Sequence, residues 1–185
     1  MGYAVGIVIY DGFSLLDLVG PFEILTQATS PDNRGQYLFE QHTVGRNKDL
    51  VTCHGGIQIL PKHIYPDAFI YDVLLVPGGP GSVDATKNLR LMNWFGRAAK
   101  LAKVIAAVGD GSFILAASGI LSGKRVAYVP GLSEAYPGVL AEQTEGIVQD
   151  KKVMTITGNG YGSELGWAII EELLGANHVQ VGSNE

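Results

Sequence analysis

Residues 104–119 read Val-Ile-Ala-Ala-Val-Gly-Asp-Gly-Ser-Phe-Ile-Leu-Ala-Ala-Ser-Gly. The first five, Val104 to Val108, form a short apolar run rich in β-branched residues, which is typical of a strand buried on both faces. The run breaks at Gly109-Asp110-Gly111, and apolar residues resume after Ser112 in a pattern that suits a buried helix. This order predicts a strand, a tight glycine turn and a helix in direct succession.

A strand, a sharp turn and a helix are the parts of a nucleophile elbow, in which the nucleophile stands at the apex of the turn. The backbone there is cramped, so small residues are needed two positions before and two positions after the apex. Ala107 and Gly111 meet this requirement and place Gly109 at the apex. Because glycine has no side chain, the sequence predicts an elbow whose nucleophile position is vacant. The turn at Gly109 should be sharp, with a strained or positive-φ backbone that glycine tolerates.

Three further segments combine apolar runs with glycine and proline. They are residues 11–23 (DGFSLLDLVGPFE), residues 72–81 (DVLLVPGGPG) and residues 155–165 (TITGNGYGSEL). Together with the elbow and residues 115–124 (LAASGILSGK), these segments resemble the DJ-1/PfpI (ThiJ) family of the class I glutamine amidotransferase-like superfamily. The resemblance covers nearly the whole chain, from Tyr3 to Gly175.

The resemblance implies one domain over residues 1–185, with a flavodoxin-like α/β fold: a three-layer sandwich around a mostly parallel sheet. It also implies a homodimer, small reactive carbonyl or isonitrile substrates, their hydration or hydrolysis, and redox sensing by an elbow cysteine. The first helix supports the dimer prediction, because Leu15, Leu18, Phe22 and Leu25 give it more apolar surface than a single sheet face can cover. This chain departs from the family at the nucleophile position of the elbow, because Gly109 stands where the cysteine is expected. Tyr128 also follows the Gly-Lys-Arg-Val segment, where many relatives carry a histidine.

The composition fits this class. A chain of 185 residues, 46% hydrophobic and with 25 glycines, suits one compact α/β domain with many tight turns. A net charge of −5 without a basic block argues against binding to nucleic acid or to anionic membranes. We see no signal peptide, and no apolar run reaches the ~20 residues that span a bilayer. With Cys53 as the single cysteine, we expect a cytoplasmic protein without disulfides.

Apolar runs alternate with helical patterns along the chain, which predicts a parallel sheet covered on both faces. We expect central strands at residues 3–10, 72–76 and 104–108, and shorter strands at 125–129, 147–150 and 153–157. Residues 37–45 and 50–60 alternate in polarity and predict edge or hairpin strands. Four helices are expected. The first, at 15–28, is capped by Ser14 and should kink or restart at Gly20-Pro21. The others lie at 89–102, after Ser112, and at 162–174, where Gly175 ends the last helix.

In such a sheet, ligands bind beyond the carboxyl ends of the strands. Three loops meet that description: the one from Asp11 to Asp17, the one at Gly78-Gly79-Pro80, and the elbow at 109–111. The backbone amide of Asp110 is expected to form half of an oxyanion hole, with Gly79 as the other half. We interpret Gly78, Gly79, Pro80, Asp110 and Gly111 as the ligand-binding backbone; the alternative is that the glycines only make tight turns.

Two aspartates are the catalytic candidates. Asp17 lies in an apolar run, where burial would raise its pKa, and in relatives the equivalent acid touches the cysteine. It could hold a water molecule, orient a ligand or act as a general base, or it could only cap the first helix. Asp110 adjoins the vacant apex and could act as nucleophile or base, although an aspartate in Gly-Asp-Gly commonly stabilises the turn.

No spacing of histidine, cysteine or carboxylate residues predicts a metal site, and no cofactor is expected. Cys53 and His54 are neighbours on a predicted strand and should face opposite ways, with Cys53 buried. Three hypotheses follow. The first is a cysteine-less family member that binds a small polar or anionic molecule at the elbow. The second is an isonitrile hydratase-like or glyoxalase-like enzyme in which Asp17 or Asp110 activates water. The third is an effector-sensing domain that acts with a separate regulatory partner.

Overall fold

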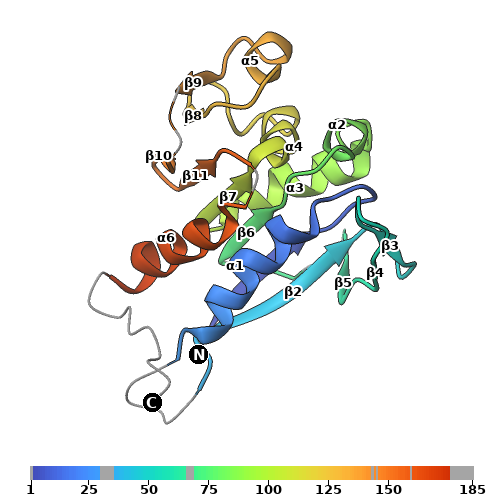
Figure 1. The fold of residues 1–185 in the computed structure, drawn as a ribbon, viewed down its shortest axis with the longest axis vertical. Helices are drawn as coiled ribbons and strands as arrows, with labels where there is room; N and C mark the ends of the chain where they lie inside the picture. The colour runs from blue at the N-terminus through green and yellow to red at the C-terminus, as the bar shows by residue number, and fades with distance from the viewer. Residues whose placement is uncertain are drawn as a thin grey trace.

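A seven-stranded sheet forms the centre of the computed structural model, which describes residues 2–29, 36–65, 69–142, 144, 146–158 and 160–175 (Figure 1). The strand order is β10-β11-β7-β6-β1-β2-β5. The strands are β1 (Tyr3–Val8), β2 (Phe39–Gly45), β5 (His63–Ile64), β6 (Val73–Val76), β7 (Val104–Val108), β10 (Val148–Asp150) and β11 (Val153–Ile156). Only β10 pairs antiparallel, with β11, so the sheet is mostly parallel as predicted.

The central strands are buried on both faces. Every residue of β6, β7 and β11 is buried, which explains why these runs are apolar without alternation. The helices that cover them are α1 (Leu15–Gln27), α3 (Leu89–Leu101) and α6 (Gly162–Leu174). The chain moves from β1 to β2 in one direction along the sheet and from β6 to β7 in the other. Right-handed crossovers therefore place α1 and α3 on opposite faces, and Figure 1 shows this three-layer arrangement.

Helices α1 and α6 lie side by side on one face of the sheet (Figure 1). Glycines make the close approach possible. A Cβ built on Gly166 would lie 2.8 Å from the Cβ of Ile24, and one built on Gly162 would lie 2.9 Å from the Cδ of Pro21. Of the two outcomes expected at Gly20-Pro21, a kink or a restart of the first helix, the restart is wrong: α1 continues through Pro21 as one helix.

The first helix also corrects part of the argument for a dimer. Among its apolar residues, Leu18 and Leu25 are buried within the chain itself. Leu15 and Phe22 are partly buried and pack against the same core. These four side chains therefore do not supply the excess apolar surface that the sequence predicted. Dimerisation remains a prediction of the family resemblance.

A second expectation also fails, because the strand predicted at residues 37–45 is not at an edge. It is β2, which pairs in parallel with β1 on one side and with β5 on the other. The alternating polarity has another cause: Glu40 points to solvent while Phe39, His42 and Val44 are buried. The other predicted hairpin exists in reduced form, as the antiparallel pair β3 (Val51–Thr52) and β4 (Gln58–Ile59).

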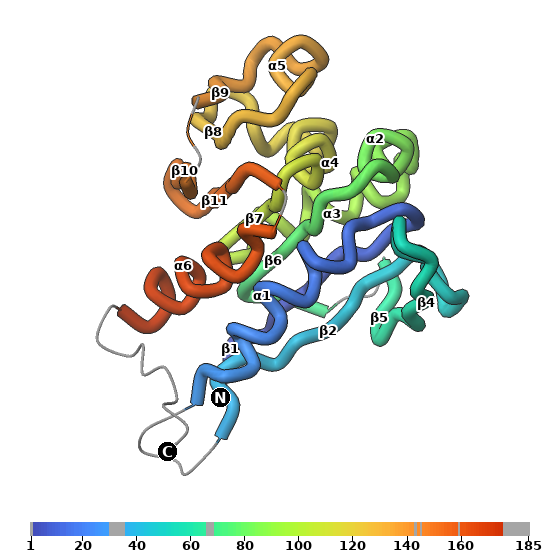
Figure 2. Tube along the Cα trace, in the orientation of Figure 1, coloured from blue at the N-terminus to red at the C-terminus, as the bar shows by residue number. Residues whose placement is uncertain are grey.

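The remaining elements are short. They are α2 (Ser82–Ala85), the 3-10 turn η1 (Gly109–Gly111), α4 (Ser112–Ala117), β8 (Arg125–Ala127), α5 (Leu132–Ala135) and β9 (Leu140–Glu142). Strands β8 and β9 pair with each other in parallel, and Figure 2 shows them with α5 as a lobe at one end of the molecule. Most of the polar stretch at residues 29–36, between α1 and β2, lies outside the described residues. The strand, turn and helix predicted at residues 104–119 are β7, η1 and α4.

Candidate functional site

The site lies at the boundary between β1 and β6. From β1 the chain builds the sheet toward β2, and from β6 it builds the sheet in the opposite direction, toward β7. The loops that follow β1, β6 and β7 all leave the carboxyl ends of adjacent parallel strands, which is the usual binding position in open α/β sheets. The first two loops are tied together, since the backbone N–H of Ser14 donates to the carbonyl of Gly78 over 2.7 Å. The Tyr10 hydroxyl adds a bond of 2.6 Å to the carbonyl of Pro77. The predicted meeting of these loops is thus found in the structure.

Asp17 is positioned by the start of α1. Ser14 caps the helix, and its Oγ accepts a hydrogen bond from the Asp17 backbone N–H over 3.4 Å. This geometry directs the Asp17 carboxyl to the loop after β6, where Oδ2 accepts from the Gly78 N–H over 3.2 Å. Asp17 is only 5% exposed. Burial raises its pKa above the ordinary value, and the hydrogen bonds from Gly78 and Ser14 oppose that shift.

Close backbone packing explains the glycines of the loop after β6. A Cβ on Gly78 would lie 2.7 Å from Asp17 Oδ2 and 3.3 Å from the Asp110 backbone nitrogen. Gly79 has φ +122°, and a Cβ on it would lie 2.5 Å from the carbonyl oxygen of Gly12. Any other residue at these two positions would push the loops apart. The glycines bring Asp17, the loop after β6 and the elbow together.

The elbow has the predicted backbone. Gly109 directly follows β7 and has φ +48°, a left-handed conformation that favours glycine. Its Cβ position faces the loop after β11: a Cβ there would lie 2.8 Å from the Cα of Gly158. The prediction of a sharp, positive-φ turn at Gly109 is confirmed.

Asp110 lies next to the apex and is partly exposed. Burial raises the pKa of its carboxyl. The Asp110 charge also raises the pKa of Asp17, although burial is the larger cause there. Two carboxyl groups whose ionisation is disfavoured therefore face the same small region, which is a common property of functional sites.

A crevice of about 640 Å³ opens at this point. Its lining residues are Ser14, Leu16, Asp17, His54, Gly79, Pro80, Gly109, Asp110, Tyr128, Val129, Pro130, Thr157, Gly158 and Gly160. Of the residues predicted from the sequence, the crevice brings together Asp17, Gly79, Pro80, Gly109 and Asp110. Gly78 and Gly111 lie behind its wall, and a Cβ on Gly111 would meet the carbonyl oxygen of Val76 at 2.5 Å.

Sequence reasoning missed three side chains of this crevice. His54 reaches it because its backbone N–H donates to the carbonyl of Phe13 over 2.8 Å. Thr157 reaches it at the end of β11, which is parallel to β7 and so ends beside the elbow. Tyr128 was noted only as a departure from the family, yet its side chain lines the crevice and is 38% exposed. The sequence signal for Tyr128 was that it stands near the position where many relatives carry a histidine. No sequence signal pointed to His54.

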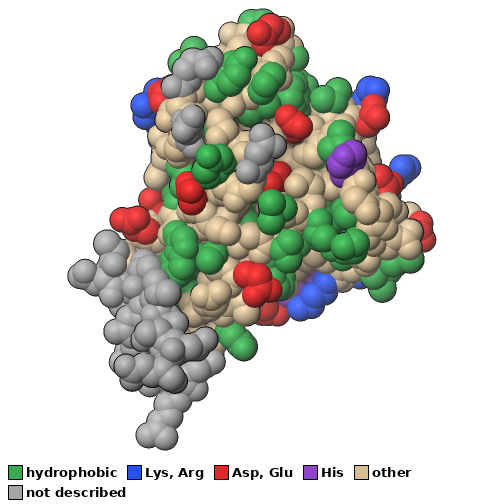
Figure 3. Space-filling view, viewed as in Figure 1, with side chains coloured by type: hydrophobic (Ala, Val, Ile, Leu, Met, Phe, Trp, Pro, Cys, Tyr) green, Lys and Arg blue, Asp and Glu red, His purple; other side chains and the backbone are tan. Residues whose placement is uncertain are grey.

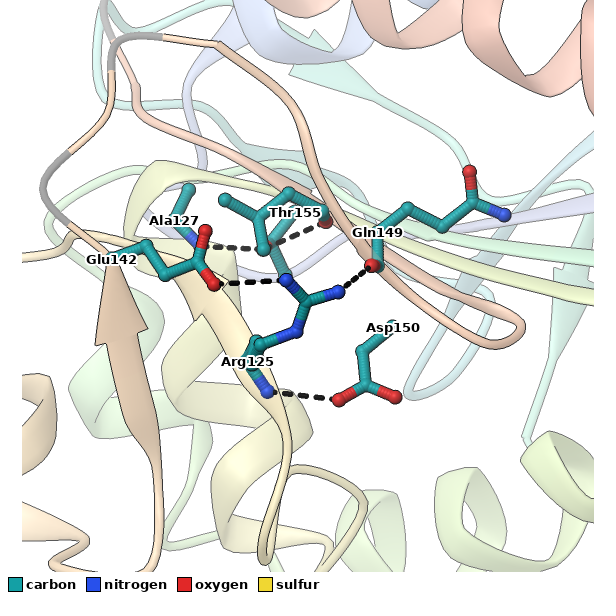
Figure 4. Close-up of polar contacts among 7 residues, drawn as sticks. Arg125, Ala127, Glu142, Gln149, Asp150 and Thr155 are labelled. Atoms are coloured by element: carbon teal, nitrogen blue, oxygen red, sulfur yellow. Dashed lines mark hydrogen bonds and ion pairs between the residues drawn. The ribbon is translucent and has the colours of Figure 1, made fainter.

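Contacts around Arg125 position the Tyr128 segment (Figure 4). The Arg125 guanidinium lies between the carboxylate of Glu142 and the carbonyl of Gln149, with each nitrogen 3.2 Å from its oxygen. The Arg125 backbone N–H donates to Asp150 over 3.0 Å, and the Ala127 N–H donates to the Thr155 hydroxyl over 2.8 Å. These bonds fix β8 against β10 and β11, so the chain emerging after Ala127 must pass the elbow.

Within the part of the chain that the structure describes, no group of three or more histidine, cysteine, aspartate or glutamate residues could hold a metal ion. Among the same residues, no helix is both long and apolar enough to cross a membrane. Cys53 is buried, as predicted, one residue beyond the end of β3.

A model of the DJ-1/PfpI family matches residues 4–172. The chain belongs to the DJ-1/PfpI family. Among curated proteins, it is 27% identical over 182 residues to an isonitrile hydratase from Pseudomonas putida, covering 98% of this chain and 76% of that protein.

Solved DJ-1/PfpI structures agree. A ThiJ/PfpI family protein from Pseudomonas syringae superimposes with a TM-score of 0.81 at 25% identity, covering 94% of this chain and 69% of that one. DJ-1beta from Drosophila melanogaster gives a TM-score of 0.81 at 23% identity, with 97% and 95% covered. The predicted family and fold are therefore confirmed, and the fold extends over nearly the whole chain.

Proposed function

We propose that the elbow crevice binds a small, uncharged polar molecule, and that the Asp17 carboxyl forms a hydrogen bond with it. The observation that carries this proposal is the position of Asp17. It is buried beside Gly109, and Gly78 occupies one of its two oxygens. At the apex, Gly109 contributes only backbone, and Asp17 and Gly109 line the same crevice, so a ligand in the crevice can reach the Asp17 carboxyl.

The charge of the crevice favours a neutral ligand over an anion. Among the described residues, its lining includes two carboxyl groups, Asp17 and Asp110, and no lysine or arginine. The face that carries α1 and α6 has acidic and apolar side chains across its middle, with Lys and Arg side chains toward its outline (Figure 3). An anion would be repelled by either carboxylate. A neutral carbonyl or isonitrile could instead accept a hydrogen bond from the backbone amide of Gly79 or Asp110.

Binding can be tested by titration followed with amide NMR. The probes are N-methylformamide and methyl isonitrile as neutral ligands, and acetate as a small anion. We expect saturable shifts of the Gly79 and Asp110 amides with the neutral probes and none with acetate. Asp17→Asn keeps hydrogen-bonding atoms at this position and should retain binding, whereas Asp17→Leu should abolish it. Asp49→Asn, an exposed residue outside the crevice, is the matched control. Equal binding by Asp17→Leu would contradict the proposal.

A second candidate is hydration of the bound molecule, and the raised pKa of Asp17 favours it. A carboxylate with a raised pKa is a stronger base than an ordinary one. In this reaction Asp17 takes a proton from water, and the water oxygen bonds to the isonitrile carbon. Asp17 then returns that proton to the carbon, which restores its carboxylate. The proton of the new hydroxyl group moves to the nitrogen as the C=O bond forms, and the product is an N-substituted formamide. The relative named isonitrile hydratase supports the choice of substrate.

One variant separates the two candidates. Asp17→Asn cannot accept the proton, so it should lose formamide production completely while it still binds methyl isonitrile. Formamide release is measured by chromatography, with Asp49→Asn as the control. If the parent binds methyl isonitrile saturably but does not turn it over, the hydration candidate is excluded and only the binding function remains. Undiminished turnover by Asp17→Asn would exclude Asp17 as the base.

A further inference from the structure

A second hollow, of about 680 Å³, lies at the other end of the sheet from the elbow. It is formed by Gly96, Ala99, Lys100, Ile105, Ser118, Gly119, Ile120, Lys124, Lys151, Lys152 and Val153. Val153 is the first residue of β11 and Ile105 the second residue of β7, so the hollow is at their amino ends. The elbow follows the last residue of β7. We call this second site the lysine hollow.

The lysine hollow combines an apolar floor with a basic rim. Ala99, Ile105 and Val153 are buried and form the floor. Four lysines line it, in a chain with 13 lysines and arginines and a net charge of −5. A local concentration of positive charge on an acidic protein attracts anions to that one place.

Two of the four lysines have structural roles. The Lys152 ammonium donates to the carbonyls of Ala99 and Ala102 over 2.7 and 2.9 Å, and so satisfies the carboxyl end of α3. Lys124 forms an ion pair of 3.7 Å with Asp150, whose other carboxylate oxygen accepts from the Arg125 backbone N–H. These contacts account for Lys152 and Lys124 without a ligand.

Lys100 and Lys151 are not accounted for in this way. Neither ammonium group forms a hydrogen bond or an ion pair with another residue in the described ranges. Lys100 stands on the last turn of α3, and Lys151 stands on the turn between β10 and β11. Two separate elements therefore contribute lysines without such a partner to the lining of the same hollow.

The backbone of Lys151 adds an independent observation. Its φ is +58°, and among the described residues it is the only non-glycine with a positive φ. Asp150 pairs with Val153, so Lys151 and Lys152 form a two-residue hairpin turn whose first position favours glycine. A lysine in this position is strained, and such strain is commonly kept where a side chain has a function.

We propose that the lysine hollow binds a small amphipathic anion, namely a carboxylate that carries a short aliphatic chain or ring. The apolar part would lie on the floor of Ala99, Ile105 and Val153, where its burial is favourable. The carboxylate would lie between the ammonium groups of Lys100 and Lys151. A volume of about 680 Å³ is within the range of small-molecule sites. This proposal is independent of the elbow crevice.

The test compares three probes on the full chain by amide NMR and calorimetry. Octanoate has both the tail and the negative head, octylamine has the tail with a positive head, and acetate has the head alone. We expect octanoate to bind and to shift the amides of Ser118 to Ile120, and the other two probes to cause no saturable change. Octylamine binding as tightly as octanoate, or octanoate shifts confined to other regions, would overturn the proposal.

Lysine variants then test whether the ammonium groups of Lys100 and Lys151 bind the carboxylate. Lys100→Gln and Lys151→Gln should each weaken octanoate binding by about threefold to tenfold, and the double variant by more. Lys87→Gln, in the turn after α2 and outside the hollow, is the matched control and should bind as the parent does. Lys151→Gly should raise the melting temperature, because it relieves the strained φ, and should still weaken binding. Unchanged affinity in the folded double variant would refute the role of these lysines.

Discussion

Gly109 and Gly158 pack backbone against backbone at the apex of the elbow. A Cβ built on Gly109 would lie 2.8 Å from the Cα of Gly158, and one built on Gly158 would lie 3.4 Å from the Cα of Gly109. The position where a relative would carry its nucleophile is therefore closed on one side by the loop after β11. The missing side chain at Gly109 and the close approach of Gly158 are complementary features of this chain.

Gly109→Ala should destabilise the protein by two separable effects. The left-handed backbone at φ +48° costs about 1–2 kcal/mol for alanine, and forcing back the Gly158 backbone adds about 1–3 kcal/mol. Gly119→Ala is the matched control, since Gly119 has φ +79° but its Cβ would meet nothing within 4 Å. Urea unfolding should show a clearly larger loss for Gly109→Ala. Equal losses of unfolding free energy in the two variants would mean that the loop containing Gly158 moves aside at no measurable cost.

Cys53 should react slowly with iodoacetamide in the native protein. It is the only cysteine of the chain, and its side chain is 3% exposed. Burial hinders access by the reagent. Mass spectrometry should find slow labelling in buffer and rapid, complete labelling in 8 M urea, which is the control. Rapid, stoichiometric labelling of the native protein at pH 7 would contradict this expectation.

The sequence predicted those parts of the site that local pattern controls. The spacing of Ala107 and Gly111 around Gly109 was enough to predict the positive φ at the apex, because the steric demands of an elbow act within five residues. Asp17 was found for a similar reason, as a carboxylate within an apolar helix start. The family resemblance then brought the three loops together.

What the sequence did not predict depends on contacts between distant segments. His54 enters the crevice through a bond to Phe13, and Gly158 meets Gly109 because β11 pairs with β7. Residues 37–45 were expected at an edge because their polarity alternates. Their place inside the sheet depends on which strands pair with β2, and a single strand's pattern does not contain that information.

Asp17 should make the protein less stable as the pH rises from acid toward neutral. Its pKa is raised in the folded state, mainly by burial. The stability associated with the protonated carboxyl is therefore fully present below the unfolded pKa of about 3.9, and it is lost as the pH rises through the folded pKa. Asp17→Asn removes this ionisation, so its stability relative to the parent should increase with pH.

Urea unfolding at several pH values between 4 and 7.5 measures this difference. Asp49→Asn serves as the control, and its stability relative to the parent should not show the same rise with pH. A difference between Asp17→Asn and the parent that is constant with pH would mean that Asp17 ionises as readily in the folded chain as in the unfolded one.

The family resemblance predicts a homodimer, with a mass twice the 19.7 kDa of the chain. Light scattering coupled to size exclusion at micromolar concentration measures this mass. Leu16, which is 60% exposed at the mouth of the crevice, offers an apolar contact on α1 that the chain itself does not cover. Leu16→Glu should therefore shift the protein toward monomer, while Leu101→Glu, an exposed leucine on α3, should not. A monomeric parent would contradict the prediction directly.

His42 should make the fold sensitive to mild acid. It is 2% exposed on β2, and its ring stacks on His63 with 4.4 Å between the ring centroids. Burial lowers its pKa, and the charges of Lys62 and His63 lower it further, against an opposing effect of Glu40. The unfolded chain therefore binds a proton at His42 more readily than the folded one. Stability associated with the neutral ring is complete above the unfolded pKa of about 6.5 and falls as the pH decreases toward the folded pKa.

His42→Phe keeps an aromatic ring that can stack on His63 but cannot take up a proton. The parent should lose stability between pH 7 and pH 5 more steeply than this variant does, when both are measured by urea unfolding. His54→Phe, at an exposed position far from the stacked pair, controls for the loss of a histidine and should keep the slope of the parent. If His42→Phe and the parent lose stability in parallel over this range, the proton taken up on acid unfolding does not belong to His42.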